Sequence, residues 1–248
     1  MTPPATAEPA STPSLRVQET FVSIQGEGEL AGVPSSFIRV SGCNLRCVWC
    51  DSPATSWAPR GDRIAVDALV ERCASGPRHV VVTGGEPLLF TETVDLTKAL
   101  AGRGHHVTIE TAATVALPNV HADLMSMSPK LAHSTPHGRD PGWAARHEDR
   151  RRRPRIIEAL MAGPWQLKFV VRAGNPDALR TDIDEIEALL AELSLPAADR
   201  AHVLLMPECI DGARLGGELA ALVPLCHATG FRLGLRLHIS LFGHTPGT

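Results

Sequence analysis

The sequence predicts an α/β fold, a partial, open βα barrel of about six parallel strands. Short β-branched or apolar runs alternate with longer helical patterns, which favours parallel strands joined by crossover helices. About six such units fall short of the eight in a closed barrel. Polar residues also recur where the expected strands end, and βα barrels gather their chemistry at those ends.

The strands are expected where apolar residues cluster over about five positions. Residues 36–40 are apolar except for Ser36 and Arg39, and residues 79–83 contain three consecutive valines. The expected strands are 36–40, 79–83, 106–110, 123–126, 166–171, 202–206 and 232–237.

Between the strands, longer segments repeat apolar residues at helical spacing. Val66, Leu69 and Val70 show this spacing in the first of them. Such segments would cross from one parallel strand to the next and cover the sheet. The expected helices are 65–75, 91–103, 144–161, 176–193 and 213–229.

Composition and charge limit the classes of protein. The 248 residues suffice for one large domain or two small ones, and 44% are hydrophobic. The net charge of −3 and a pI near 6.4 favour neither nucleic acid nor an anionic membrane as partner. No apolar run is long enough to span a membrane. Residues 1–14 lack a secretory pattern and are expected to be a disordered tail before a single domain at 15–248, in a reducing cytoplasm.

One segment, 133–164, departs from the βα pattern and is expected to be a charged insertion. It carries Pro, Gly and His residues and the basic run from Arg150 to Arg153. Such a run is most often a solvated face. The alternative is a contact surface for a phosphate-bearing partner or an acidic protein.

Three cysteines, Cys43, Cys47 and Cys50, form a C-x3-C-x2-C run after the first expected strand. In a reducing compartment, clustered cysteines favour metal over disulfides. A structural zinc site normally has four protein ligands. A [4Fe-4S] cluster held by three cysteines leaves one iron open to a cofactor or substrate. The spacing therefore favours a reactive cluster, with zinc or a disulfide as alternatives.

Further polar groups follow the next strands. Gly84 and Gly85 would let the backbone approach a ligand closely, and Glu86 adds a carboxylate that suits an amino-acid ammonium group. Glu110 ends one strand, and the run from Ser128 to Lys130 follows another. Each could be turn chemistry alone, but their shared position at strand ends predicts one site.

Four residues outside these motifs are candidates for a second ligand. Gln25 and Glu27 could bind the edge of a polar heterocycle, or form an ordinary polar loop. Arg39 lies in an apolar strand, and a buried arginine needs a partner, best a carboxylate. His238 comes at the end of the last expected strand, directly after residue 237, where a structural role is the commoner one. Ser52, after Asp51, could bind Mg²⁺ or begin a helix.

Together these motifs resemble a known superfamily. C-x3-C-x2-C followed by Gly-Gly-Glu-Pro resembles the radical S-adenosylmethionine enzymes. With Gln25-Gly26-Glu27-Gly28, Phe37-Ile38-Arg39, Cys50-Asp51, Glu110-Thr111 and Ser128-Pro129-Lys130, the chain resembles the 7-carboxy-7-deazaguanine synthase family from about residue 19 to 238. Two departures are Ser52, where Thr is frequent, and Arg236-Leu237-His238-Ile239, where many members have Gln-Thr-His-Lys.

The resemblance implies a reaction: radical ring contraction of 6-carboxy-5,6,7,8-tetrahydropterin to 7-carboxy-7-deazaguanine, with loss of ammonia, as in queuosine-type pathways. It implies a [4Fe-4S] cluster, S-adenosylmethionine and Mg²⁺ as cofactors, a reducing electron-transfer protein and a second copy of the chain as partners. The implied site residues are Cys43, Cys47 and Cys50 for the cluster; Ser52 for Mg²⁺; Gly84, Gly85, Glu86, Glu110, Ser128 and Lys130 for S-adenosylmethionine; and Ile24, Gln25, Glu27, Arg39 and His238 for the pterin.

Two other functions remain open from the sequence. One is a radical-generating activase that acts on a protein, which the loop with Gln25 and Glu27 disfavours. The other is a non-catalytic iron–sulfur or zinc scaffold that uses its arginine run to bind RNA or protein. The low net charge and the short length of the basic run disfavour that alternative.

Overall fold

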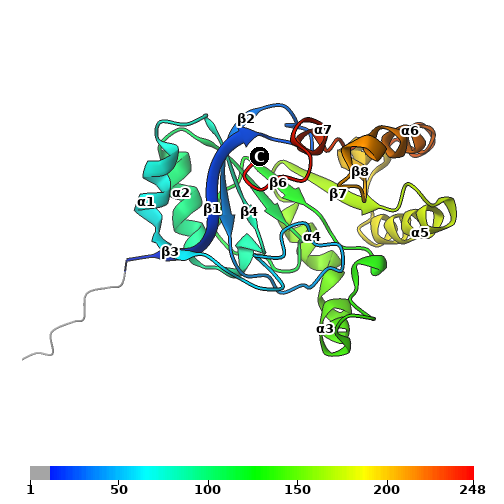
Figure 1. Ribbon diagram of the computed structural model, residues 1–248, viewed down its shortest axis with the longest axis horizontal. Coiled ribbons are helices and arrows are strands. Elements are labelled where there is room, and N and C mark those ends of the chain that lie inside the picture. The colour runs from blue at the N-terminus through cyan, green and yellow to red at the C-terminus, as the bar shows by residue number, and fades with distance from the viewer. Residues whose placement is uncertain (1–11) are drawn as a thin grey trace, which may run out of the picture.

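The computed structural model describes residues 12–248, which form a nine-stranded sheet. The strands follow the order β3-β1-β2-β4-β5-β6-β7-β8-β9. All neighbours from β2 to β9 are parallel, whereas β1 is antiparallel to both β2 and β3. The sheet curves without closing, and the helices lie on its outer side (Figure 1). The predicted partial, open βα barrel is thus confirmed.

The elements have the following bounds. The strands are β1 Ser14–Ile24, β2 Pro34–Val40, β3 Asp62–Ala65, β4 His79–Gly84, β5 His106–Thr111, β6 Leu124–Met127, β7 Trp165–Val171, β8 Val203–Pro207 and β9 Arg232–Leu233. The helices are α1 Val66–Cys73, α2 Glu92–Gly102, α3 Pro141–Arg151, α4 Pro154–Leu160, α5 Pro176–Glu192, α6 Gly212–Thr229 and α7 Leu237–Phe242. Short 3₁₀ turns cover Pro87–Leu89, Ala132–Ser134 and Ala197–His202.

The core lies between the parallel strands and the helices. In β4, Val80, Val81 and Val82 are fully buried, as expected for a parallel strand covered on both faces. Each covering helix contributes one apolar stripe, such as Ile186 and Leu189 in α5. This packing holds the carboxyl ends of the strands at one rim, where the candidate residues were expected.

The first strand and the third were not among the predicted elements. In β1, Leu15 and Val17 are buried and alternate with less buried neighbours, so a period of two was present in the sequence. β1 begins at Ser14, and the Pro13 carbonyl accepts a hydrogen bond from Val66 N at 2.9 Å. The predicted tail, residues 1–14, therefore overlaps the start of β1. Its residues 1–11 lie outside the described part.

Two other predictions were wrong in their boundaries. The helix expected at 144–161 is two helices, because Pro154 has no N–H and forces the preceding residue out of helical geometry. The strand expected at 232–237 pairs over only two residues. The chain then turns into α7, so Arg236 caps a helix and His238 lies in it. Among the described residues, no helix is long and apolar enough to cross a membrane.

A buried histidine between two strands makes stability depend on pH. His79 Nδ1 lies 2.7 Å from Ser35 Oγ, and Nε2 lies 2.7 Å from Thr108 Oγ1. Burial, and then the charge of His106 nearby, lower the pKa of His79 from 6.5 to about 4. The unfolded chain therefore binds more protons in this window, and stability decreases as pH falls from 6.5 towards 4.

We expect the free energy of unfolding to fall by roughly 1.4 kcal/mol for each pH unit between the two pKa values of His79, 6.5 and about 4. Urea unfolding at about pH 7.5 and about pH 5.5 measures this change. His79→Asn should be less stable at the higher pH yet show a weaker pH dependence. The exposed His227 serves as control, since His227→Asn should keep the wild-type pH dependence. An unchanged slope in His79→Asn would contradict a neutral buried imidazole.

Candidate functional site

The loop after β2 carries the three cysteines as free thiols. The Cys43 sulfur accepts from Leu45 N at 3.4 Å, and the Cys50 sulfur lies 3.2 Å from Ser56 Oγ. Trp57 Nε1 donates to the Cys47 carbonyl at 2.9 Å. These contacts fold the loop around the sulfurs and bring all three into one small apolar cluster.

The three thiols fit a multi-iron cluster better than one ion. Within residues 12–248, no group of three or more Cys, His, Asp or Glu side chains is close enough to hold a single metal ion. In a [4Fe-4S] cluster each cysteine binds a different iron, so the sulfurs need not converge on a point. Burial raises the pKa of Cys43 and Cys47 to about 12. Thiolates at such buried positions need bound cations, which iron provides.

The loop after β4 lies directly on the cysteine loop. Gly85 N donates to the Val40 carbonyl at 3.0 Å, and Glu86 N donates to the Gly42 carbonyl at 2.9 Å. A Cβ at Gly85 would lie 2.0 Å from the Gly42 carbonyl oxygen. Gly84 has φ 118°, a conformation that favours glycine. Both glycines thus allow close approach of the chain's own backbone.

Glu86 is fully buried and its carboxylate is enclosed by protein. It accepts from Thr111 Oγ1 at 2.7 Å, from Ala112 N at 2.9 Å and from Leu88 N at 3.2 Å. Burial outweighs these hydrogen bonds and raises the pKa of Glu86. The side chain therefore joins the ends of β4 and β5.

Inside the barrel, a buried lysine joins two carboxylates. Lys168, in β7, is 3% exposed, and its Nζ donates to Glu27 Oε2 at 3.0 Å and to Glu110 Oε1 at 3.1 Å. Gln25 Nε2 donates to Glu110 Oε1 at 3.3 Å, and Thr83 Oγ1 donates to Glu110 Oε2 at 2.8 Å. We call Gln25, Glu27, Glu110 and Lys168 the polar row.

The polar row is held ionised by its own charges. Burial alone would raise the pKa of Glu27, but Lys168 and then Arg236 outweigh it and hold that pKa below its ordinary value. Burial would likewise lower the pKa of Lys168, yet Glu110 and Glu27 raise it. The row therefore presents fixed acceptors and a fixed cation at neutral pH.

A second set of contacts links the polar row to the end of the cysteine loop. Arg236 donates to Glu27 Oε1 at 3.3 Å and to Asp51 Oδ2 at 3.2 Å. Ser52 Oγ donates to Asp51 Oδ1 at 3.2 Å and accepts from Arg39 Nη1 at 3.3 Å. Residues far apart in sequence thus form one continuous polar surface beside the cysteines.

The remaining candidates lie around this surface. Arg39 Nε pairs with Glu19 at 2.7 Å, in β1. His238 packs on Gly26, where an added Cβ would lie 2.0 Å from its Nδ1. Ile24 ends β1 and is half-buried. Burial lowers the pKa of His238, so its imidazole is neutral at neutral pH.

Ser128 and Lys130 follow β6, and Lys130 Nζ donates to Ser128 Oγ at 2.8 Å. The Lys130 ammonium also lies 5.5 Å from the centre of the Trp49 ring. Trp49 stacks on His133, the first residue of the charged insertion, with ring centres 5.7 Å apart. The loop after β6 therefore borders the cysteine loop.

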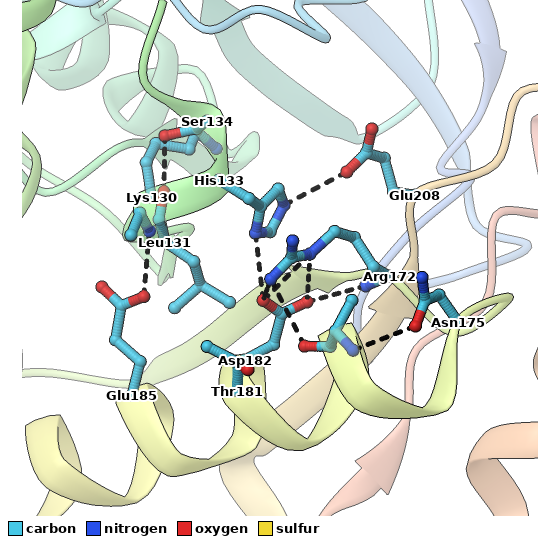
Figure 2. A network of polar contacts seen from close by, with 12 residues as sticks. Lys130, Leu131, His133, Ser134, Arg172, Asn175, Thr181, Asp182, Glu185 and Glu208 are labelled. Carbon is cyan, nitrogen blue, oxygen red and sulfur yellow. Dashed lines mark hydrogen bonds and ion pairs between the residues drawn. The ribbon is translucent and has the colours of Figure 1, made fainter. Parts of the chain in front are cut away.

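Figure 2 shows how the loop after β6 is fixed to α5 and β8. His133 lies 3.2 Å from both Asp182 and Glu208. Burial by itself lowers the pKa of His133, but the two carboxylates outweigh it and raise that pKa. Asp182 also holds Arg172, and Ala132 N donates to Glu185 Oε2 at 2.9 Å. These contacts position Lys130 and Ser128.

Comparison with known proteins identifies the family. A family model described as the Radical SAM superfamily matches residues 37–160. A 7-carboxy-7-deazaguanine synthase from Rhodopirellula baltica is 44% identical over 96% of this chain and 91% of that protein. The chain belongs to the 7-carboxy-7-deazaguanine synthase family. A synthase of the same name from Halobacterium salinarum is 43% identical over 95% of this chain and 93% of that protein.

Solved structures agree with this 7-carboxy-7-deazaguanine synthase family assignment. QueE from Escherichia coli aligns with a TM-score of 0.62 and 25% identity, over 91% of this chain and 95% of that one. Streptococcus suis SuiB, bound to S-adenosylmethionine, shares the fold at a TM-score of 0.51 and 15% identity, over 81% of this chain and 50% of that one. As a radical SAM enzyme, the chain uses a [4Fe-4S] cluster and S-adenosylmethionine.

One residue of the site of this family member was not singled out from the sequence. Lys168 stands between Leu167 and Phe169 in an apolar strand, the same signal that drew attention to Arg39. Arg236 was named from the sequence beside His238, as part of a departure from the family pattern. Its partners Glu27 and Asp51 follow only from the turn into α7. A charged residue within a buried strand is therefore the signal that could have found Lys168.

Proposed function

We propose that this enzyme converts 6-carboxy-5,6,7,8-tetrahydropterin to 7-carboxy-7-deazaguanine with loss of ammonia. The polar row beside the cysteine loop is the observation that carries the proposal. It presents carboxylate acceptors at Glu27 and Glu110 and donors at Gln25 and Lys168 within hydrogen-bond distance of one another. A pterin edge alternates donors and acceptors and needs such fixed partners, because unpaired buried polar groups are costly.

The pterin would lie along the polar row, with Gln25, Glu27 and His238 at its ring and Ile24 against an apolar part. Arg39 would bind the substrate carboxylate, for which its guanidinium is well matched. The contacts from Arg39 through Ser52 to Asp51 support this role, because they link Arg39 to the end of the cysteine loop.

We infer that Cys43, Cys47 and Cys50 hold the cluster, which with bound S-adenosylmethionine supplies hydrogen-atom abstraction from the substrate. The backbone at Gly84, Gly85 and Glu86, together with Glu110, Ser128 and Lys130, would bind the amino acid and nucleoside of that cofactor. Glu86 would act through the loop it fixes, since its carboxylate is already hydrogen-bonded. Lys130 offers a cation at the same rim.

We further propose that Ser52 binds Mg²⁺ together with the substrate. Its hydroxyl and the Asp51 carboxylate lie side by side, and Mg²⁺ often takes few protein ligands and completes its shell with substrate and water. The positively charged Arg39 guanidinium lies 3.3 Å from Ser52 Oγ and disfavours a cation there until the substrate carboxylate is also bound. Mg²⁺ should therefore bind more tightly with the pterin present, which calorimetry with and without substrate measures.

The deciding experiment is anaerobic incubation of the cluster-loaded chain with S-adenosylmethionine, dithionite and the carboxypterin, with mass detection of products. We expect 7-carboxy-7-deazaguanine and ammonia in equal amounts. Cleavage of S-adenosylmethionine without any deazapurine would contradict the proposed substrate and favour a radical activase. No cleavage at all would favour a non-catalytic cluster scaffold.

Changing Arg39 to alanine should mainly weaken substrate binding. Loss of one charged hydrogen-bonding partner costs about 1.5–3 kcal/mol, which corresponds to a rise in KM of roughly tenfold to a hundredfold. The matched control is Glu19→Gln, which removes the protein's own partner of Arg39 and should change KM far less. Steady-state kinetics on both variants checks this. Equal KM values for Arg39→Ala and wild type would remove Arg39 from the site.

We also infer that the enzyme acts as a homodimer and receives electrons from a reducing protein. Its family resemblance supports both statements. Sedimentation of the cluster-loaded chain at several concentrations tests the dimer. A single species of about 26.5 kDa throughout would contradict it.

A further inference from the structure

The charged insertion lies on the cysteine loop. Arg46 N donates to His147 Nδ1 at 3.1 Å, and Val48 N donates to the Ser134 carbonyl at 2.9 Å. Arg150 Nη1 donates to the Asn44 carbonyl at 3.1 Å. The insertion therefore covers the backbone on both sides of Cys47, and α3 projects beyond it, away from the sheet (Figure 1).

His147 anchors this contact as a neutral group. It is fully buried, and its Nε2 lies 2.8 Å from Ser134 Oγ, which itself donates to the Leu131 carbonyl. Burial lowers the pKa of His147 to about 4. The position of α3 on the cysteine loop is thus set by buried hydrogen bonds, which fixes the arginines that α3 carries.

The arginines around this contact divide into two groups. Arg151 pairs with Glu148 and Glu185, Arg152 with Glu192, and Arg153 with Asp149. These pairs tie the insertion to α5 or stay within the insertion.

The second group has no ion pair with any residue in the described part of the chain. Four of its members, Arg46, Arg139, Arg146 and Arg150, are what we call the arginine face. Arg139 and Arg146 are exposed, and the other two are half-buried.

Two tryptophans hold the arginine face in place. The Arg46 guanidinium lies 4.0 Å from the centre of the Trp143 ring, and Arg146 lies 5.3 Å from the same ring. Arg139 lies 3.7 Å from the Trp57 ring, whose Nε1 donates to the Cys47 carbonyl. Stacked guanidinium groups keep their charge available while losing side-chain freedom in advance. The face is therefore an ordered positive surface that adjoins a cluster ligand.

The charge is also local. Residues 136–155 contain seven arginines against three carboxylates, in a chain of net charge −3. A positive surface on an acidic protein steers acidic partners to one place. This surface lies next to the cysteines, where an electron donor would have to bind, because the cluster must receive each electron from outside the chain.

We propose that the arginine face is the docking surface for an acidic one-electron donor protein. The inference rests on the proposed function only in that the chain holds a reducible cluster. In each transfer the donor's reduced centre loses one electron and the cluster gains it, with no bond made or broken in either protein. The surface fits a protein better than nucleic acid, since four charges are few for a phosphate backbone and a nucleic acid brings no electron.

The test uses the cluster-loaded full chain and, as probe, an acidic plant-type [2Fe-2S] ferredoxin. The variant carries Arg139→Glu and Arg146→Glu. The matched control carries Arg63→Glu and Arg180→Glu, two exposed arginines in β3 and α5 that form no ion pair with described residues. Both changes alter the net charge equally. Binding is measured by calorimetry at about 20 mM and about 300 mM salt, and cluster reduction by stopped-flow absorbance.

We expect the arginine-face variant to bind ferredoxin about tenfold or more weakly at low salt, and the control within about twofold of wild type. High salt should remove most of the difference. Reduction by ferredoxin should slow in the variant, whereas reduction by dithionite should be unchanged, which shows that fold and cluster are intact.

Equal affinities in variant and control, or no ferredoxin binding by the wild type, would overturn the proposal. Tighter binding of an RNA duplex that is lost in the same variant would assign the face to nucleic acid instead. The docking assays contain no pterin and do not depend on its turnover. If the separate turnover experiment gave no deazapurine, the proposed function would be overturned and the docking result would still stand.

Discussion

Replacing Cys47 with alanine should abolish both the iron–sulfur cluster and the cleavage of S-adenosylmethionine. Cys47 is 8% exposed and lies between the other two thiols in a loop whose hydrogen bonds converge on it. A cluster that already relies on three cysteines has no spare protein ligand. Iron content after anaerobic reconstitution should fall from about four per chain to near zero.

The matched control for Cys47 is Cys73, a buried thiol in α1 far from the loop in sequence. Cys73→Ala removes a sulfur of the same kind but should keep full iron content. Its cost should be limited to roughly 1–2 kcal/mol of stability from the small cavity. Iron analysis, the visible spectrum and deoxyadenosine formation distinguish the two variants. A Cys47→Ala protein that still binds four irons would show that the ligands are other residues.

Replacing Lys168 with methionine should cost about 3–5 kcal/mol of stability, the range for breaking a buried ion pair. The variant leaves Glu27 and Glu110 facing each other without their shared cation. Pterin turnover should be lost as well, because one carboxylate would take up a proton or the row would rearrange. The cluster should remain, since Lys168 contacts none of the cysteines in the described part of the chain.

Two further variants sharpen the Lys168 test. Lys98→Met in α2 removes an exposed lysine and should change stability by less than about 0.5 kcal/mol. Combining Lys168→Met with Glu110→Gln removes one of the uncompensated charges and should recover part of the lost stability. Urea unfolding measures each value. Additive losses in the double variant would mean that Lys168 and Glu110 do not interact.

The parts of the site that could be predicted from sequence are those that depend on short-range spacing. The three cysteines lie within eight residues, so any loop that joins β2 to the next element keeps them together. The two glycines at the end of β4 could also be predicted as part of the site, because they come directly after a run of apolar strand residues. Their physical reason differed from the prediction, because they admit the backbone of the cysteine loop.

The polar row could not be predicted as a unit. Glu27 and Lys168 are separated by 141 positions, and only the curvature of the sheet brings the loop after β1 within 3.0 Å of β7. Nothing in the local sequence states which charged residue pairs with which, since a charge in a strand specifies the need for a partner and not its identity. The division of the insertion's arginines into paired and unpaired groups has the same origin.

The predicted element boundaries were wrong where a proline or a turn in the backbone outweighed the hydrophobic pattern. Pro154 divided one predicted helix, and the turn after β9 placed His238 on α7. The sequence alone determined the fold class, the clustering of the three cysteines and the family, because these depend on repeated strand and helix patterns and on close cysteine spacing. Only the tertiary structure decided the partners of Glu27, Lys168, Arg39 and Arg236, because buried charges find their counterions across the barrel, between segments that the chain itself does not connect.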